Sequence, residues 1–294
     1  MRKHLRHTAL TATLSLLAAA AAAQSARSSA TTSWPSCSAD NKPDATLQVC
    51  LRPVAIDRID QAGATLGLDY RIDYLRSLGG GGQTSKGKDV VDEKDANVVI
   101  RDGQLAARLR GTLTAAREKN PHKLIDLTGS WRYAISTLPA YYYAGADLAF
   151  ETDQSLENKQ FTLGLTGAVT KGGIVRASDV GTVILSLARV EPRDDTAREK
   201  AEGSLRAFNR WNLEASYSVG VAHRMLRSID FNYRHYQELS PSRAIRAAGL
   251  DQNRRGLVRL NLDRDFFFQY SRGSLPFDQR SVRAVTVGWS MKLD

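Results

Sequence analysis

Residues 209–222 read NRWNLEASYSVGVA, and this stretch shows the pattern that decides the fold. Apolar or small side chains take the odd positions from Trp211 to Val221, and polar or small ones, among them Glu214, take the even positions. Successive side chains of a β-strand point to opposite faces of a sheet, so this alternation predicts a strand with one apolar and one polar face. A helix would instead need apolar residues three or four positions apart.

The same period of two recurs along most of the chain. It is found in residues 64–74, 105–115, 125–135, 142–151, 161–169, 182–190, 228–237, 257–270 and 285–293. Residues 46–52 and 97–101 are further strands or extensions of neighbouring ones. The sequence therefore predicts an antiparallel all-β fold of about 10–12 strands, most of them near the ~9–11 residues that a tilted strand needs to cross a bilayer.

The N-terminus has the features of a secretory signal peptide. Arg2, Lys3 and Arg6 precede an apolar stretch at residues 8–23, after which small and polar residues follow. This order predicts a signal peptide that covers residues 1–26 and is removed on export. The alternative is a membrane anchor, but a spanning helix needs ~20 apolar residues. No other apolar run is long enough for one, so a membrane form would have to be a closed barrel.

Export changes what the cysteines and the charge imply. Cys37 and Cys50 are the two cysteines of the chain. In an oxidising periplasm they would pair and close a small loop, and the alternative is that both stay unpaired. The formal net charge is +10, and +7 without the basic residues of the signal peptide. Export argues against nucleic acid as a partner and favours lipopolysaccharide, acidic polysaccharide or small anions, if the charge has a partner at all.

Alternation by itself fits a membrane barrel and also a periplasmic β-sandwich, which turns one face to a core and the other to water. Strand length favours the barrel, because strands of soluble proteins average ~5–6 residues. Aromatic residues also gather near the ends of the expected strands, for example Tyr70 with Tyr74 and Trp131 with Tyr133. A barrel places such residues in girdles at the two membrane interfaces, whereas a sandwich would use them in its core.

In these features the chain resembles the broad class of Gram-negative outer-membrane β-barrel proteins, over most of its mature length and without a family-specific motif. The resemblance implies an up-and-down barrel in the outer membrane, surrounded by lipid and lipopolysaccharide and inserted by the barrel-assembly machinery. Such proteins usually end in an aromatic residue that this machinery recognises. This chain ends in WSMKLD at residues 289–294, so that Leu293 would have to take that role.

The resemblance also implies how the chain is divided into segments. Residues 27–45 are rich in Ser, Thr and Pro and are expected to form an irregular leader before a single barrel domain at residues 46–294. Long loops are expected near residues 77–96, 191–207 and 240–254, where charged or Gly-rich sequence interrupts the alternation. Counting strands back from a periplasmic C-terminus places the last two loops in the periplasm, although barrels normally carry their long loops outside.

The polar face of each strand would line the lumen of such a barrel. The candidates for lining it and for binding a solute are Arg71, Arg108, Arg110, Arg132, Arg234, Arg259, Asp69, Asp126, Glu214 and Asp263. Asp263 shares a strand face with Asp265 and Arg259, which predicts a salt-bridged stretch of lumen wall. The arginines would either favour anions in a pore or neutralise nearby carboxylates in a plugged barrel.

Catalytic and metal-binding patterns are missing from the sequence. It contains no Gly-x-Ser-x-Gly, His-Glu-x-x-His or Cys-x-x-Cys motif, and no role is evident for His122, His223 or His235. No enzyme activity, metal or cofactor is therefore expected. The leading hypothesis is a porin-like channel or export component for anionic or saccharide solutes. The alternatives are a non-transporting surface barrel (an adhesin, phage receptor or structural envelope protein), a periplasmic ligand-binding sandwich and, as a minority view, an outer-membrane hydrolase.

Overall fold

The computed structural model describes residues 38–41, 45–61, 63–78, 100–136, 140–278 and 280–290. The strands are β1 (Ser38–Asn41), β2 (Ala45–Arg58), β3 (Thr65–Ser77), β4 (Ile100–Thr114), β5 (Ile125–Ser136), β6 (Ala140–Thr152), β7 (Lys159–Gly172), β8 (Asp179–Asp194), β9 (Phe208–Gly220), β10 (Leu226–Leu239), β11 (Gln252–Leu262), β12 (Phe266–Gly273) and β13 (Val282–Trp289). The helices are α2 (Thr196–Glu202), α3 (Arg243–Ala247) and the 3-10 turns η1 (Arg117–Lys119) and η2 (Asp263–Asp265).

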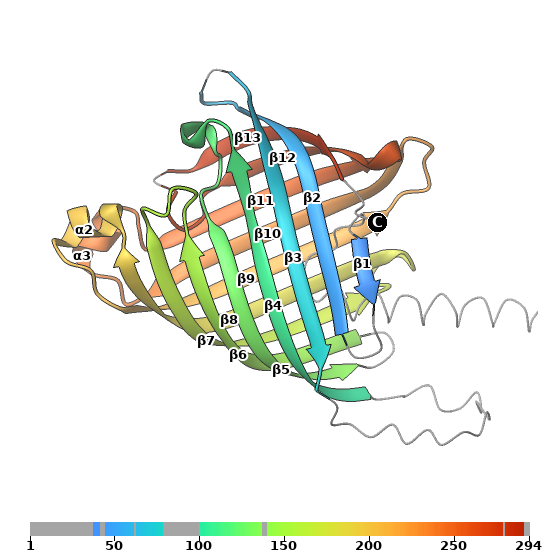
Figure 1. Ribbon diagram of the computed structural model, residues 1–294, viewed down its shortest axis with the longest axis horizontal. Coiled ribbons are helices and arrows are strands. Elements are labelled where there is room, and N and C mark those ends of the chain that lie inside the picture. Colours follow the sequence, from blue (N-terminus) through green and yellow to red (C-terminus); the bar gives the residue numbers. More distant parts are fainter. Residues whose placement is uncertain are drawn as a thin grey trace, which may run out of the picture.

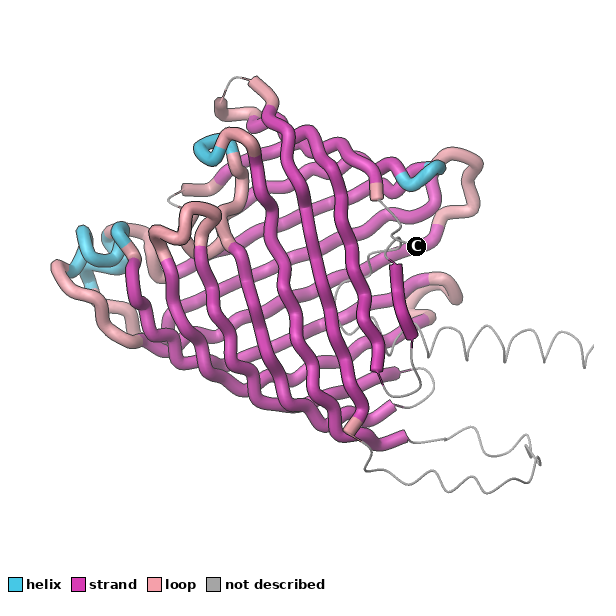
Figure 2. Tube along the Cα trace, in the orientation of Figure 1, coloured by secondary structure: helices cyan, strands magenta, loops and turns pink. Residues whose placement is uncertain are grey.

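Strands β2 to β13 form a closed antiparallel barrel (Figure 1). Each strand pairs with the next one along the chain, and β13 pairs with β2 to close the sheet. Strands of the near and far walls cross in projection (Figure 2), because the strands of a closed barrel tilt against its axis. The predicted all-β up-and-down barrel is confirmed, with twelve strands in the wall. Among the described residues, no helix has the length and apolar character to cross a membrane.

Alternation along the strands separates an apolar outer surface from a polar interior. On β7, Leu163 and Leu165 are 62% and 69% exposed, whereas Thr162 and Thr166, one position away, are each 7% exposed. Inward-facing arginines such as Arg71, at 3%, are more deeply buried than most apolar residues. A soluble sandwich would bury its apolar face, so this distribution is that of a barrel surrounded by lipid.

One expected strand is in fact two. Residues 257–270 were predicted to form a single strand, but η2 breaks them into the end of β11 and most of β12. Arg264 and Asp265 adopt positive φ values of 56° and 61° there, and β11 pairs with β12 as a hairpin. The three turn residues leave Leu262 and Phe266 on the same face, so the period of two continues in phase across the hairpin and conceals it.

The missed hairpin also corrects the sidedness of the loops. The connections that carry η1, α2 and α3, at residues 115–124, 195–207 and 240–251, leave the barrel at one end, here called the helix end (Figure 1). β13 runs away from the helix end and finishes at the opposite end, here called the turn end. The loops predicted at 191–207 and 240–254 therefore lie on the opposite side from the C-terminal end of β13, because the additional hairpin reverses the count.

The segments before the barrel and between β3 and β4 are described only in part. The predicted signal peptide at residues 1–26 and most of the predicted loop at residues 77–96 lie outside the described residues. Within the leader that was predicted to be irregular, Ser38–Asn41 forms β1 and pairs with residues 46–49 of β2. β13 pairs with β2 only at residues 54–58, so β1 covers the edge of β2 that β13 leaves open.

Candidate functional site

The structure brings nine of the ten predicted lumen residues into the barrel interior. Arg71, Arg132, Arg234, Arg259 and Asp126 are buried on inward-facing strand positions, at 3–8% exposure. The half-buried residues of this set are Asp69, Arg108, Arg110 and Glu214. Each has the strand parity that points inward, as the alternation predicted.

Asp263 is the exception, and its predicted place in the lumen wall is wrong. It lies in η2 at the turn end, where its side chain is 55% exposed. Its carboxylate lies 2.8 Å from Nη2 of Arg227, and Asp265 lies 3.0 Å from Nη1 of the same guanidinium. These contacts link the turn of the β11–β12 hairpin to the start of β10, and the chain reverses at the point where the sequence was expected to continue as a strand.

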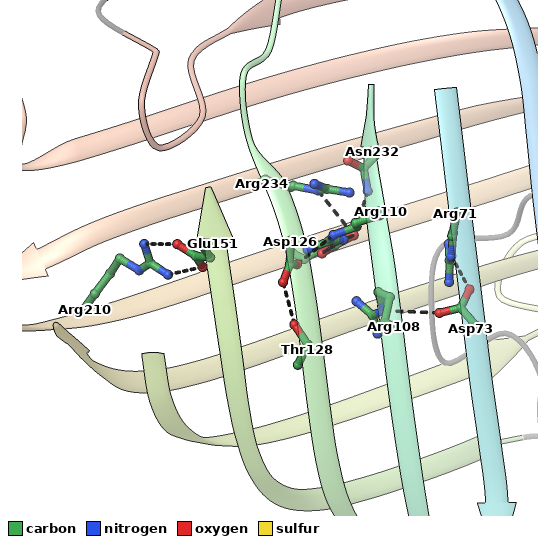
Figure 3. A network of polar contacts seen from close by, with 11 residues as sticks. Arg71, Asp73, Arg108, Arg110, Asp126, Thr128, Glu151, Arg210, Asn232 and Arg234 are labelled. Carbon is green, nitrogen blue, oxygen red and sulfur yellow. Dashed lines mark hydrogen bonds and ion pairs between the residues drawn. The ribbon is translucent and has the colours of Figure 1, made fainter. Parts of the chain in front are cut away.

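A cluster of ion pairs crosses the centre of the lumen. Arg110 on β4 places Nη1 3.1 Å from Oε2 of Glu214 on β9. Its Nε also donates to Asp126 on β5, at 3.0 Å (Figure 3). Arg234 on β10 lies 3.5 Å from the other oxygen of Glu214. Four strands separate β4 from β9 in one direction around the wall and six in the other, so the Arg110–Glu214 pair joins opposite walls.

A cavity of about 90 Å³ lies on each side of this pair, and both cavities share Arg110 and Arg234 as lining residues. The first, here called the basic cavity, is lined by the charged residues Arg71, Arg110, Arg234, Arg255, Arg259, Asp69 and Asp230. The second, here called the balanced cavity, is lined by the charged residues Arg108, Arg110, Arg132, Arg234, Asp126, Asp147, Glu151 and Glu214. The basic cavity has five arginines against two carboxylates, whereas the balanced cavity has equal numbers of each.

Most lumen arginines are held by specific contacts. Arg71 and Arg108 both pair with Asp73, and Arg210 pairs with Glu151 at 2.6 Å (Figure 3). Other arginines lie over aromatic rings. The guanidinium of Arg132, for example, lies 4.5 Å from the ring centroid of Tyr143. A guanidinium over a ring face is attracted by the ring's negative quadrupole. Arginine side chains are thus held against the barrel wall by aromatic rings as well as by carboxylates.

Arg255 differs from these arginines and was missed in the sequence. It lines the basic cavity, makes no ion pair with another described residue, and its Nε has no hydrogen-bond partner among them. A signal for it existed, since Arg255 is four positions from Arg259 and therefore on the same strand face. It went unnoticed because it lies two positions before the window in which the alternation was recognised.

Two connections close the basic cavity at the helix end, and residues 115–124 and 274–278 are together called the loop cap here. Asp278 joins them: its carboxylate accepts from the backbone N–H of Lys123 at 2.9 Å and of Leu275 at 2.8 Å. The same carboxylate lies 3.2 Å from Nδ1 of His122. Beneath these contacts an apolar cluster of Leu124, Leu275 and Tyr236 packs against the wall. The sequence placed His122 in a turn without a role.

Burial sets the protonation of His122 in the loop cap. Desolvation is the largest cause that lowers the pKa of His122 to about 4, and the positive charge of Arg255 lowers it further. The hydrogen bond from the imidazole to the Asp278 carboxylate raises the pKa of His122, but it is outweighed. Nε2 of the ring lies 3.3 Å from Oγ of Ser271 on β12. His122 is therefore neutral at neutral pH and serves as a buried hydrogen-bonding link between the loop cap and the barrel wall.

The predicted disulfide between Cys37 and Cys50 stays a prediction. Cys37 lies outside the described residues, and Cys50 is buried on β2 at 1% exposure. Their sequence neighbours Ser38 and Val49 are partners in the register of β1 with β2. That register agrees with the predicted pairing.

No protein family and no curated protein matches the sequence. Solved structures with a similar fold include the NanC porin, at 12% identity and a TM-score of 0.45, covering 83% of this chain and 100% of that one. The outer membrane channel DcaP of Acinetobacter baumannii is 10% identical with a TM-score of 0.41, covering 86% and 99%. A BenF-like porin from Pseudomonas fluorescens Pf-5 is 8% identical with a TM-score of 0.34, covering 85% and 99%.

Proposed function

We propose that the protein is an outer-membrane channel for small anionic solutes, among them acidic saccharides, with the loop cap over its outer mouth. The observation that carries this proposal is the charge of the basic cavity, where five arginines face two carboxylates. An excess of fixed positive charge inside a low-dielectric wall lowers the energy of an anion and raises that of a cation. Lumen charge therefore supports selectivity for anions.

Arg255 supports a binding role for this charge. A structural arginine in a plugged lumen would be expected to have a carboxylate partner, because an uncompensated buried charge is costly. Arg255 has no such partner among the described residues, although Asp278 of the loop cap is near enough to act on it electrostatically. The guanidinium presents five donors in a rigid fork that suits carboxylate and phosphate groups. It is therefore the side chain best placed to contact a solute beneath the loop cap.

Loop lengths support the orientation of the channel. Outer-membrane barrels carry their long loops outside and their short turns in the periplasm. By this rule the helix end, with the loops that contain α2 and α3, faces the exterior and the turn end faces the periplasm, although the long connection between β3 and β4 belongs to the turn end. Solutes would then enter past the loop cap, reach Arg255 first and pass the Arg110–Glu214 pair afterwards.

A second candidate is a non-transporting surface barrel, and one specific observation favours it. The Arg110–Glu214 pair joins opposite walls, so the lumen is not an open tube in this conformation. The two functions differ in what happens to this pair. In a channel a solute anion replaces Glu214 as the partner of Arg110 during passage, whereas in a structural barrel the pair is permanent.

Solute flux into liposomes separates the two candidates. The full barrel is reconstituted, and swelling is measured in isosmotic glucuronate and in glucose, which are similar in size and differ in charge. The channel proposal expects faster entry of glucuronate, and a reduced preference in the Arg255→Gln variant. Arg189→Gln is the matched control, because this arginine lies on the outer face of β8 with its side chain 61% exposed. Entry that is absent, or equal for both solutes, would contradict the proposal.

A further inference from the structure

Three arginines form a basic cluster on the outer face of the barrel, close to the helix end. Arg254, Arg272 and Arg283 lie on the adjacent strands β11, β12 and β13, and all three are exposed. Arg272 and Arg283 are direct partners in the strand register. Among the described residues neither makes an ion pair, and Arg254 donates to Gln252, a neutral side chain. Like charges directly opposite on a sheet face destabilise it, so this cluster is suited to an anion that lies between them.

An apolar groove of about 750 Å³ leads away from this cluster across the outer surface. Arg272 lies at one end of the groove, and Lys171 and Ile174 lie at the other. Its floor is low because outward-facing positions carry small residues, among them Ala215 on β9 and Gly256 on β11. One side of the groove is formed by Tyr217, Phe231, Val258 and Tyr270, which are partners in one register row, and Tyr233 lies between these two small residues.

The strand register shows the direction of the groove. Val183, Ala215, Tyr233, Gly256 and Arg272 are successive partners in one row across β8 to β12. Strands lie roughly 4.8 Å apart, so this row is about 19 Å long. The row begins at Arg272, beside Gly273, which is the last residue of β12 at the helix end. From there it runs obliquely toward the turn end. Its length is thus about the depth of one leaflet of a bilayer whose hydrocarbon core is ~30 Å thick.

We propose that this groove binds one acyl chain of a phosphorylated outer-leaflet lipid, with a headgroup phosphate held by Arg254, Arg272 and Arg283. The groove faces the hydrocarbon core, where an acyl chain fits, and the arginines lie at the rim, where a headgroup lies. Arginine binds phosphate through charge-assisted, often bidentate hydrogen bonds. A phosphate between Arg272 and Arg283 also removes their mutual repulsion. Charge favours a lipid over a second copy of the chain, which would bring arginines of its own to a symmetric contact.

Native mass spectrometry of the detergent-purified barrel with bisphosphorylated lipid A tests the proposal. Two variants remove the two halves of the site: Arg272→Gln with Arg283→Gln removes the phosphate contacts, and Gly256→Phe fills the groove. A Cβ at Gly256 meets no atom within 4 Å, so the backbone there can carry a side chain that projects into the groove. Each variant is expected to weaken lipid binding about tenfold or more, the first because it removes strong charge-assisted contacts and the second because it excludes the acyl chain.

Matched controls separate this site from general contact with lipid. Gly129→Phe places the same ring on the outer face of β5, where a Cβ has no neighbour nearer than 3.9 Å. Arg76→Gln removes an exposed outward charge at the turn end of β3. Both controls should bind lipid A as the wild type does, and all variants should keep the heat-modifiable mobility of a folded barrel. Equal loss in the controls, unchanged binding in the site variants or equal binding of dephosphorylated lipid A would overturn the proposal. A dimer mass abolished by Gly256→Phe would assign the groove to a second copy instead.

Discussion

Arg110 and Glu214 lie 3.1 Å apart although β4 and β9 belong to opposite walls of the barrel. Both side chains are half-buried, at 15% and 13% exposure, and Asp126 and Arg234 extend the pair on either side. Among the described residues, the space on each side of the pair is a small cavity and not part of one continuous channel. The pair therefore obstructs passage along the lumen.

Glu214→Gln should widen this path and weaken the fold. The substitution leaves Arg234 without its carboxylate partner and Arg110 with Asp126 alone. Removing one partner of a buried ion pair costs about 3 kcal/mol, and less where water reaches the site. We expect a larger single-channel conductance together with a lower midpoint in urea unfolding.

The control for this prediction is Glu191→Gln, which removes a carboxylate from the exposed outer face of β8. It should change neither conductance nor stability, because exposed ion pairs contribute little. If Glu214→Gln behaves like the control, the cross-lumen pair does not limit passage.

Acidification should loosen the loop cap through His122. Its pKa is lowered to about 4 in the closed structure, mainly by burial, whereas an exposed histidine titrates near 6.5. Between about pH 4 and 6.5, His122 therefore binds a proton when the loop cap is open and stays neutral when it is closed. The closed state is fully favoured above about pH 6.5 and loses about 1.4 kcal/mol per pH unit as the pH falls toward 4. Charges facing the ring are those of Asp278, Arg255 and Arg234.

Hydrogen exchange measures this loosening directly. Peptides that contain the Lys123 and Leu275 amides, both donors to Asp278, should lose protection between pH 6.5 and 4 after correction for intrinsic rates. His122→Gln keeps a side chain able to hydrogen-bond and does not titrate, so its protection should vary much less over this window. The same pH dependence in both proteins would assign the effect to another group.

Gly273→Ala should destabilise the end of the β11–β12 hairpin. Gly273 has a φ of +130°, and a Cβ there would lie 1.9 Å from the backbone oxygen of Arg254. A substitution that the backbone conformation cannot accept costs more than about 1 kcal/mol. Gly256→Ala is the control on the neighbouring strand and should be neutral or slightly stabilising. Unfolding midpoints that do not differ between the two variants would contradict the described backbone at Gly273.

The predicted disulfide can be tested by intact mass. The protein purified from membranes under non-reducing conditions should gain about 2 Da on reduction, as one S–S bond becomes two thiols. Cys50→Ser should abolish this difference. Labelling of both cysteines by a thiol reagent in the unfolded, unreduced protein would show that Cys37 and Cys50 are not paired.

The barrel could be predicted from the sequence because lipid and lumen impose opposite polarity on alternate residues. Windows such as residues 209–222 therefore predicted their strands and the inward face of Glu214 correctly. The hairpin at η2 was not visible, since a three-residue turn preserves the phase of the alternation between Leu262 and Phe266. That omission alone misplaced Asp263 and reversed the sidedness of the long loops.

Most of the candidate site depends on contacts that a period-two pattern does not contain. Arg110 and Glu214 could both be placed in the lumen, but their contact across it depends on the diameter and register of the closed barrel. The role of His122 arises from Asp278, which is 156 residues away in the chain. Such long-range pairings are set by strand order and not by local sequence.

The reversal potential of the reconstituted barrel in a planar bilayer with a KCl gradient tests the central claim most directly. An excess of arginines in the basic cavity predicts step-like currents whose reversal potential has the sign of anion selectivity, and the Arg255→Glu variant should shift it toward zero or beyond. Repeated insertions without current steps, or a cation-selective potential in the wild type, would contradict an anion channel.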